Sequence, residues 1–407
     1  MPAVPADPKE LFRDIVGLAH VALAVSGGSD SMALLRLVRD WRTALADEAP
    51  LVTVLTVDHG LREGSDKEAR QVSGWSRSLS LPHDILQWTG PKPESGIQAR
   101  ARSARYDLMT EWCHQNGVGA LLTAHTLDDQ AETVLMRLAR TRSIESLAGI
   151  PRHGQWKGID LLRPLLALRR NDLRRYLQSL GQAWIEDPSN MDGRFERVRL
   201  RRLLPELADD GISAERLAAL AADCASLASV LRGHVQRWIR AHVTEYDAGY
   251  CQFPAADFNA QPLRLRLQVL GRIIAHYGGS TPERGELERL APIMAERPSR
   301  RTLGGALIWA RGGDFMVGRE PGRIDPAPVV VPSTGWILWD KRFKVTAPPG
   351  AAILPAGTTA YLRTDRSLPR SVRLAEPVVR LPDGRLGLAA EWADQGVLAQ
   401  FVRITQV

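Results

Sequence analysis

A loop rich in glycine and serine carries the clearest chemical signal in the sequence. It reads SGGSDS and lies between an apolar run at 21–25 and a helical pattern that begins MALLRLV. Two glycines allow positive φ angles and a close approach of the backbone to a ligand. The N-terminus of the following helix directs free N–H groups and a partial positive charge into the loop. No lysine follows the second glycine, so this is not a Walker A loop. We predict a nucleotide-binding loop that comprises Ser26, Gly27, Gly28, Ser29, Asp30 and Ser31.

Asp30 needs a cation beside it if this loop binds phosphate. A carboxylate repels a phosphate group, and Mg²⁺ is usually held by one or two carboxylates together with substrate phosphates. We therefore predict Asp30 as a Mg²⁺ ligand. The alternative is a carboxylate that only caps the helix.

Further polar residues follow two other apolar runs. Asp58 and His59 come directly after VTVLTV at 52–57, and His125 follows ALLTA at 120–124. Ligands of open α/β sheets bind outside the carboxyl ends of the strands. We therefore predict that Asp58 and His125 belong to the same site, with Asp58 as a nucleotide-binding residue. For His59, a structural role is the better interpretation.

An acidic cluster, Asp128, Asp129 and Glu132, opens the next helical pattern. Residues three or four apart share one face of a helix, so Glu132 can converge with either aspartate. Acids in a first turn also complement the helix dipole, but three of them beside His125 exceed that need. The cluster could hold a metal ion or bind an ammonium group.

Two arginines, Arg102 and Arg105, lie on the helix predicted over 97–115. Both lie on one side of this helix, from which either could reach a phosphate or a ribose. Solvent exposure on an amphipathic helix is the alternative, and charge alone does not separate the two.

Strands and helices alternate over the first 140 residues. Short apolar runs predict strands, and apolar residues that recur at steps of three and four predict helices. Their alternation predicts an α/β fold with a doubly wound parallel sheet. The expected strands are 21–25, 52–57, 83–88 and 120–124, and the expected helices are 97–115 and 128–140.

The pattern changes after residue 150. A β-hairpin with a turn at Gly312 and Gly313 is expected in 301–320, and PGRIDPAPVVVP reads as a linker. We predict three domains: an α/β catalytic domain at 1–212, a helical domain at 213–322 and a small β-rich domain at 330–407. Helices are expected near 172–180, over 194–207, and at 214–240, 263–277 and 284–296.

The composition is that of a globular protein. Of 407 residues, 44% are hydrophobic and 24% are charged, values that exclude a mostly disordered, collagen-like or coiled-coil chain. No apolar run approaches the ~18 residues of a membrane span, and the N-terminus does not resemble a signal peptide. Cys113, Cys224 and Cys251 lie far apart, so we expect neither disulfides nor a cysteine zinc site, and a cytoplasmic location.

Positive charge is concentrated in one block. The net charge is +7, and residues 137–202 hold 14 Arg and 1 Lys against 7 Asp or Glu. Such a block suggests a polyanionic partner, nucleic acid first. A solvated arginine-rich face is the alternative. Arg outnumbers Lys 47 to 6 in the whole chain, which indicates a codon bias rather than a local adaptation of this block.

Six segments resemble one known family. The SGGSDS loop is similar to the signature of the PP-loop ATP pyrophosphatases, which cleave ATP between the α- and β-phosphates. Within that superfamily, residues 1–205 closely resemble the bacterial tRNA(Ile)-lysidine synthetases, with DDQAET and DPSN as the most specific blocks. The likeness is weaker over 214–320 and loose beyond. The segments are AVSGGSDSMAL, VDHGLR, ARSARYDLM, TAHTLDDQAETVLMRLAR, PLLALRRNDLRRYL and WIEDPSNMDGRFERVRLR.

The resemblance implies ATP-dependent ligation of free L-lysine to C2 of the wobble cytidine in the CAU anticodon of tRNA(Ile). The cytosine 2-carbonyl oxygen attacks the α-phosphate of ATP and gives an adenylated tRNA and pyrophosphate. The side-chain amine of lysine then attacks that carbon and expels AMP, which leaves lysidine. We therefore expect ATP as a substrate, Mg²⁺ as a cofactor, and tRNA(Ile) and free lysine as partners. We expect no association with a membrane.

The resemblance also implies roles for individual residues. The loop would hold pyrophosphate, Asp30 would hold Mg²⁺, and Arg102 or Arg105 would stabilise the α-phosphate or the adenylate. The lysine substrate would be bound by His125, Asp129 and Glu132, and either His125 or Asp129 would accept the proton of its amine, whose pKa is ordinarily ~10.4. From the basic block at 137–202, rather than from the resemblance, we expect Arg199, Arg201 and Arg202 to contact the tRNA.

Two positions depart from the family pattern. Thr126 stands where the family often has a second histidine, and Arg140-Thr141-Arg142-Ser143 replaces a glycine-rich turn.

Two alternative functions remain to be weighed against lysidine formation. They are another PP-loop tRNA-modifying enzyme or nucleotide ligase, and a non-catalytic RNA-binding protein on the same scaffold. A monomer and a homodimer are both compatible with the sequence.

Overall fold

Two compact units make up the chain, residues 1–228 and 229–407. The computed structural model describes residues 6–45, 49–61, 64–89, 97–140, 143–186, 193–194, 196–296, 300–359 and 368–404. The boundary between the units falls within one long helix, α9 (Ala214–His242). The division into three domains at 1–212, 213–322 and 330–407 stays a prediction.

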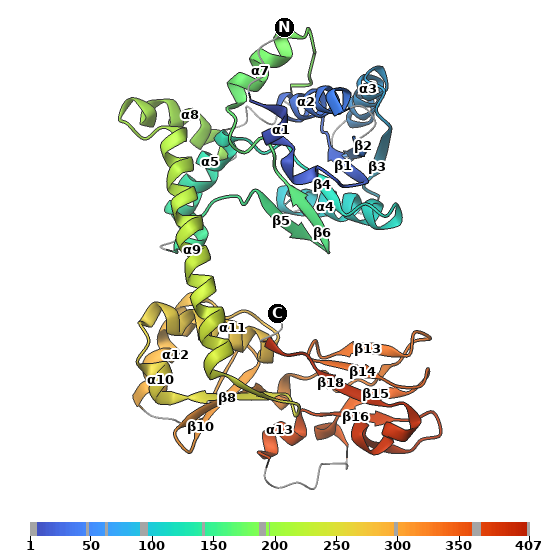
Figure 1. Ribbon diagram of the computed structural model, residues 1–407, viewed down its shortest axis with the longest axis vertical. Helices are drawn as coiled ribbons and strands as arrows, with labels where there is room; N and C mark the ends of the chain where they lie inside the picture. The colour runs from blue at the N-terminus through green and yellow to red at the C-terminus, as the bar shows by residue number, and fades with distance from the viewer. Residues whose placement is uncertain are drawn as a thin grey trace. The chain divides into compact units, whose positions relative to one another are not determined.

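A six-stranded sheet forms the centre of the first unit, in the order β3-β2-β1-β4-β6-β5 (Figure 1). The pairs from β3 to β6 are parallel, and the edge strand β5 is antiparallel to β6. The predicted doubly wound α/β fold is therefore confirmed. The strands are β1 (His20–Ala24), β2 (Leu51–Asp58), β3 (His83–Gln87), β4 (Ala120–Leu122), β5 (His153–Trp156) and β6 (Ile159–Leu162).

Helices cover both faces of this sheet because successive side chains of a strand point to opposite faces. Val21 and Leu23 of β1 join a core with α2 and α7, whereas Ala22 packs with Tyr106 and Met109 of α4. The helices of this unit, besides α9, are α1 (Pro8–Leu11), α2 (Ser29–Leu45), α3 (Ser65–Ser78), α4 (Ile97–Gln115), α5 (Leu127–Leu138), α6 (Ile144–Leu147), α7 (Arg170–Ser179) and α8 (Glu196–Asp209).

The strand order explains why distant polar residues meet. β1 lies between β2 and β4, and the SGGSDS loop, Asp58 and His125 lie at the carboxyl ends of these three neighbouring strands. β5, β6 and α3 were not predicted, since short strands and a mostly polar helix leave little periodic signal. The four predicted strands are present, and so are the helix predicted after the SGGSDS loop and the helices predicted at 97–115 and 128–140.

The second unit combines helices with three antiparallel sheets. The predicted hairpin is formed by β10 and β11, with Arg311 paired to Asp314 around the glycine turn. It is the centre of a five-stranded sheet inside the segment expected to be helical, and the predicted β-rich end contributes sheets of four and three strands. The helices here are α10 (Ala255–Asn259), α11 (Leu263–Gly278), α12 (Arg284–Glu296) and α13 (Arg370–Leu374). The strands are β7 (Thr244–Tyr246), β8 (Tyr250–Pro254), β9 (Arg301–Leu303), β10 (Ala306–Arg311), β11 (Asp314–Arg319), β12 (Val329–Val330), β13 (Trp336–Trp339), β14 (Phe343–Thr346), β15 (Ala352–Pro355), β16 (Pro377–Arg380), β17 (Leu386–Leu388) and β18 (Leu398–Phe401).

One apolar core runs through the second unit. It extends from Val235 to Ile404 and includes side chains from α11, from the five-stranded sheet and from the strands after residue 340. The helical and β-rich segments of this unit therefore share a core. Among the residues described in both units, no helix is both long enough and apolar enough to cross a membrane.

Candidate active site

A cavity of about 920 Å³ opens at the carboxyl ends of β1, β2 and β4. It brings most of the predicted site residues together and adds arginines from α7 and α8. Gly27, Asp58 and Glu132 do not belong to the lining. The predicted residues that line it are Ser26, Gly28, Ser29, Asp30, Ser31, Arg102, Arg105, His125 and Asp129, and they are joined by Arg170, Arg174, Arg197 and Arg201.

The SGGSDS loop is closed by its own hydroxyl groups. The Ser31 hydroxyl donates to the Gly28 carbonyl oxygen (2.9 Å) and accepts the backbone N–H of Ser26 (3.2 Å). Gly27 has a φ of +87°, and a Cβ there would lie 2.6 Å from Cδ1 of Ile185. Only glycine fits both constraints, and it lets the loop approach the chain closely at residue 185. Helix α2 begins within the loop, at Ser29.

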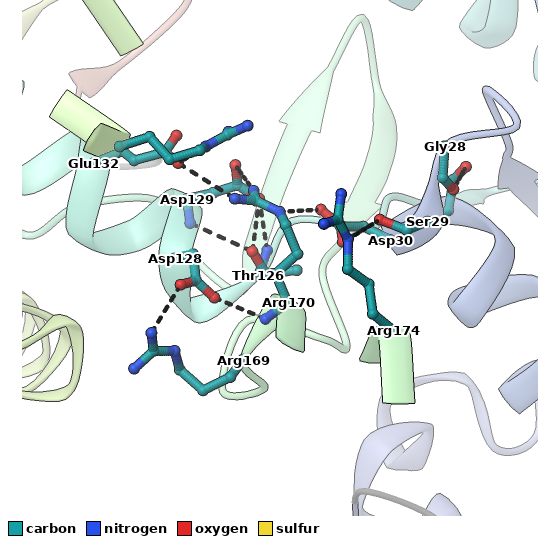
Figure 2. A network of polar contacts seen from close by, with 12 residues as sticks. Gly28, Ser29, Asp30, Thr126, Asp128, Asp129, Glu132, Arg169, Arg170 and Arg174 are labelled. Carbon is teal, nitrogen blue, oxygen red and sulfur yellow. Dashed lines mark hydrogen bonds and ion pairs between the residues drawn. The ribbon is translucent and has the colours of Figure 1, made fainter. Parts of the chain in front are cut away.

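Arg170, at the start of α7, contacts three carboxylates with three different nitrogen atoms (Figure 2). Its Nε lies 2.9 Å from Asp30, its Nη2 lies 3.0 Å from Asp129, and its Nη1 lies 3.4 Å from Glu132. The side chain is only 15% exposed. Burial would lower the pKa of Arg170, but Asp30 and Asp129 outweigh burial and raise it. The guanidinium is therefore a permanent counter-ion that joins the loop to the acidic cluster.

The first turn of α5 fixes both the acids and Arg170. Asp129 and Thr126 form a capping box, in which Asp129 accepts the Thr126 backbone N–H (2.9 Å) and hydroxyl (3.0 Å). Asp128 accepts the backbone N–H of Arg170 (2.7 Å) and pairs with Arg169 (3.1 Å). Burial would raise the pKa of Asp129, but Arg170 and the Thr126 hydrogen bonds outweigh it and lower the pKa. Asp129 is therefore ionised and already engaged by the chain on both oxygens.

Glu132 is fully buried and retains one oxygen without a partner. Its Oε1 accepts Nε of Arg201 (2.8 Å) in addition to Arg170, whereas its buried Oε2 has no hydrogen-bond partner among the described atoms. Arg201, predicted to contact tRNA, thus lies on the acidic cluster. The three carboxylates that Arg170 contacts, Asp30, Asp129 and Glu132, carry three formal negative charges against the two positive charges of Arg170 and Arg201, which leaves one formal negative charge in this Arg170 network.

Another part of the cavity lining offers positive charge. The guanidinium carbons of Arg102 and Arg105 lie 5.2 and 5.7 Å from the centre of the Tyr106 ring. Neither guanidinium pairs with a carboxylate of the described chain. Burial lowers the pKa of Arg105, although an arginine stays charged in a protein. These two side chains are free to receive an anion.

His125 is held in its neutral form. Burial, followed by the charges of Arg163, Arg102 and Arg105, lowers its pKa to about 3 in spite of the opposing effect of Asp129. Its Nδ1 lies 3.0 Å from the Thr123 hydroxyl. At neutral pH the ring therefore carries no charge and has one nitrogen that can accept a proton.

Three predicted positions lie away from this arrangement. Asp58 accepts the Ser65 hydroxyl (2.6 Å) and the Gly60 backbone N–H (3.1 Å), contacts that fix the turn before α3. Arg199 and Arg202 lie on the exposed side of α8, where Arg199 donates to backbone carbonyl oxygens at 193 and 194. The DPSN block at 187–190 and residues 141 and 142 lie outside the described residues.

Arg170 and Arg174 were missed as site residues. Both lie within PLLALRRNDLRRYL, one helical turn apart, so they share a face of α7. The signal was the basic pair at the start of a helix that carries a family motif. What it could not show is the packing of α7 against α2, which brings both side chains to the loop.

We predict a pH-dependent loss of stability at His125. The unfolded chain binds a proton near pH 6.5, whereas the folded chain resists it until about pH 3. Stability therefore falls as the pH drops below 6.5, and between pH 7.5 and 5.5 this one group costs about 1.4 kcal/mol. Urea unfolding of His125→Gln should show a correspondingly smaller loss. The control His234→Gln, at an exposed histidine, should match wild type, and equal losses in all three would contradict the buried neutral ring.

Comparison with known proteins places this cavity in a family. The PP-loop domain family matches residues 4–207. The tRNA(Ile)-lysidine synthase of Bradyrhizobium diazoefficiens is 38% identical over 79% of this chain and 96% of its own length. That of Methylobacterium sp. (strain 4-46) is 42% identical over 79% and 97%, and that of Ruegeria pomeroyi is 39% identical over 81% and 77%. The chain therefore belongs to the tRNA(Ile)-lysidine synthase family, within the PP-loop ATP-binding proteins.

Proposed function

We propose that this cavity ligates free L-lysine to C2 of the wobble cytidine of tRNA(Ile), through an adenylated tRNA, with release of pyrophosphate and AMP. The observation that carries the proposal is that one cavity joins a phosphate loop to the Arg170 network, which keeps one uncompensated formal negative charge. Phosphates need positive charge around them, whereas a cationic amino acid needs negative charge, and this cavity offers both. Membership of the family, whose relatives are named tRNA(Ile)-lysidine synthase, supports these substrates.

In the first step, the cytosine 2-carbonyl oxygen attacks the α-phosphate and pyrophosphate leaves. The loop and the N-terminus of α2 present N–H groups to the pyrophosphate, where negative charge develops. Arg102 and Arg105, which pair with no carboxylate of the described residues, stabilise the α-phosphate and the adenylate. Fixed guanidinium groups in a partly buried cavity act more strongly than they would in water.

Mg²⁺ fits Asp30 as part of a mixed site. Burial raises the pKa of Asp30 in spite of Arg170, so a nearby cation would favour its ionised form. The described residues contain no cluster of three acids, histidines or cysteines that could hold a metal alone, which suits an ion shared with nucleotide phosphates. When bound, it would offset phosphate charge.

In the second step, the side-chain amine of lysine attacks C2 and AMP leaves. Asp129 lines the cavity and attracts the ammonium group, and the buried Glu132, which shares Arg170 with it, adds negative charge at the same place. The single positive charge of the ammonium group balances this network. His125 is neutral and Asp129 is ionised, so both are in the form that accepts a proton. The proton of the ammonium passes to His125 or Asp129 as the carbon–nitrogen bond forms.

The RNA partner and the location follow from charge and cysteine chemistry. Helix α8 carries Arg199 and Arg202 on its exposed side, from which both can contact tRNA phosphates. All three cysteines are free and buried, which fits a reducing cytoplasm.

Purified protein with ATP, labelled lysine and tRNA tests the function. We expect label in RNA, with AMP and pyrophosphate formed in equal amounts, and loss of all three products in Asp30→Ala. Products of ADP and inorganic phosphate would contradict the proposal. AMP and pyrophosphate without labelled RNA would indicate another PP-loop ligase, and no turnover of ATP would indicate a binding protein.

Removal of one acid should separate the two steps. In Asp129→Asn or Glu132→Gln, we expect pyrophosphate release to persist while lysine incorporation falls about tenfold or more, since a charged hydrogen bond contributes ~1.5–3 kcal/mol. The matched control is Asp172→Asn, an acid of α7 that pairs with the exposed Arg175 and does not line the cavity. Pyrophosphate release and lysine incorporation that fall in parallel in a folded variant would show that these acids do not bind lysine.

The exposed arginines of α8 should contribute to tRNA affinity. The double variant Arg199→Ala, Arg202→Ala should weaken tRNA binding and reduce the slope of log affinity against log salt by about 1–2, because each lost phosphate contact removes ~0.7–0.9. Arg201→Ala should instead act on lysine incorporation, since Arg201 lies on Glu132. A double variant with the wild-type salt slope would identify these side chains as solvated.

A further inference from the structure

Arg174 brings a second arginine of α7 to the phosphate loop. Its Nε lies 3.3 Å from the Ser29 hydroxyl, and its side chain lines the cavity. Figure 2 shows it beside Ser29, one helical turn from Arg170, with its guanidinium at the loop. Ser29 is the first residue of α2, so this guanidinium lies at the end of the helix that attracts anions.

Arg170 and Arg174 have opposite surroundings. Arg170 is neutralised by three carboxylates, whereas the carboxylate that pairs with Arg174 among the described residues is Glu186, at 3.3 Å. Glu186 is 63% exposed, and the same oxygen accepts the Trp184 indole N–H (2.7 Å). An exposed pair of this length is weak and exchanges readily with water or another anion. Arg174 therefore has positive charge available for a ligand.

The packing of α7 does not need Arg174. Leu173 and Leu177 of α7 are fully buried against α2, and the Tyr176 hydroxyl donates to Asp40 (2.7 Å). Arg174 stays 40% exposed. Its position toward the loop is thus set by its neighbours on the helix, and its own contacts to Ser29 and Glu186 add little to the fold.

We propose that Arg174 binds the β- and γ-phosphates of ATP, and the pyrophosphate that leaves. The proposal rests on the proposed function, which puts the pyrophosphate on the SGGSDS loop. The guanidinium leaves Glu186 and donates to phosphate oxygens next to Ser29, a geometry that suits its fork of N–H donors. Arg102 and Arg105 remain with the α-phosphate, so the two ends of the triphosphate have separate arginines.

Binding of ATP, AMP and inorganic pyrophosphate, each measured by calorimetry with Mg²⁺ and without tRNA, tests this division. Arg174→Ala should bind ATP and pyrophosphate about tenfold or more weakly, and AMP as wild type does, because AMP lacks the outer phosphates. Arg174→Lys should restore part of the affinity. Glu186→Gln should bind pyrophosphate more tightly, since the competing carboxylate is gone. Arg175→Ala is the matched control, a neighbour that is 77% exposed and paired with Asp172, and should change nothing.

Two results would overturn the assignment. If Arg174→Ala keeps the wild-type affinity for pyrophosphate, the side chain does not contact the outer phosphates. If its affinity for AMP falls as much as for ATP, with an unchanged melting temperature, the effect is not specific to those phosphates. Wild-type protein that binds ATP without labelling RNA would contradict the proposed function and leave this assignment standing, whereas protein that binds neither ATP nor pyrophosphate would remove both.

Discussion

The ion pairs of Arg170 are the interaction on which the candidate active site depends. Three buried or half-buried carboxylates at one place repel one another, and each unpaired charge in such a place is costly. The guanidinium of Arg170 forms ion pairs with all three, and the backbone N–H of Arg170 donates to Asp128. Because the carboxylates come from α2 and α5 and the arginine from α7, the same contacts hold these three helix N-termini around the cavity.

This constraint divides the cavity into regions with different charge. The acids beside Arg170 leave a formal charge of −1, while carboxylates of the part of the chain that the structure describes compensate Arg102, Arg105 and Arg174 weakly or not at all. Burial then acts differently on each titratable group: it raises the pKa of Asp30, and it keeps His125 neutral. A nucleotide and a cationic amino acid can therefore occupy neighbouring places without either one being repelled.

Local sequence information predicted the parts of the site that are continuous in the chain. The SGGSDS loop, the strands that precede it and His125, and the acidic turn of α5 all have short-range signals, and the structure shows them as expected. The partners of Glu132 could not be predicted, since Arg170 and Arg201 lie 38 and 69 residues away along the chain. Asp58 was predicted from its position at the end of a strand, but that position does not tell whether a carboxylate faces a ligand or fixes the next turn.

The choice of guanidinium groups as counter-ions has a chemical consequence of its own. In the proposed reaction, a primary amine attacks an activated carbon, and any other unprotonated amine nearby would compete with the substrate. Arg170 and Arg201 cannot compete, because a guanidinium retains its proton in a protein and is not a nucleophile. No lysine of the described chain lines the cavity, and only 6 of the 53 basic residues are lysines. The site is thereby protected against modifying the tRNA with its own side chains.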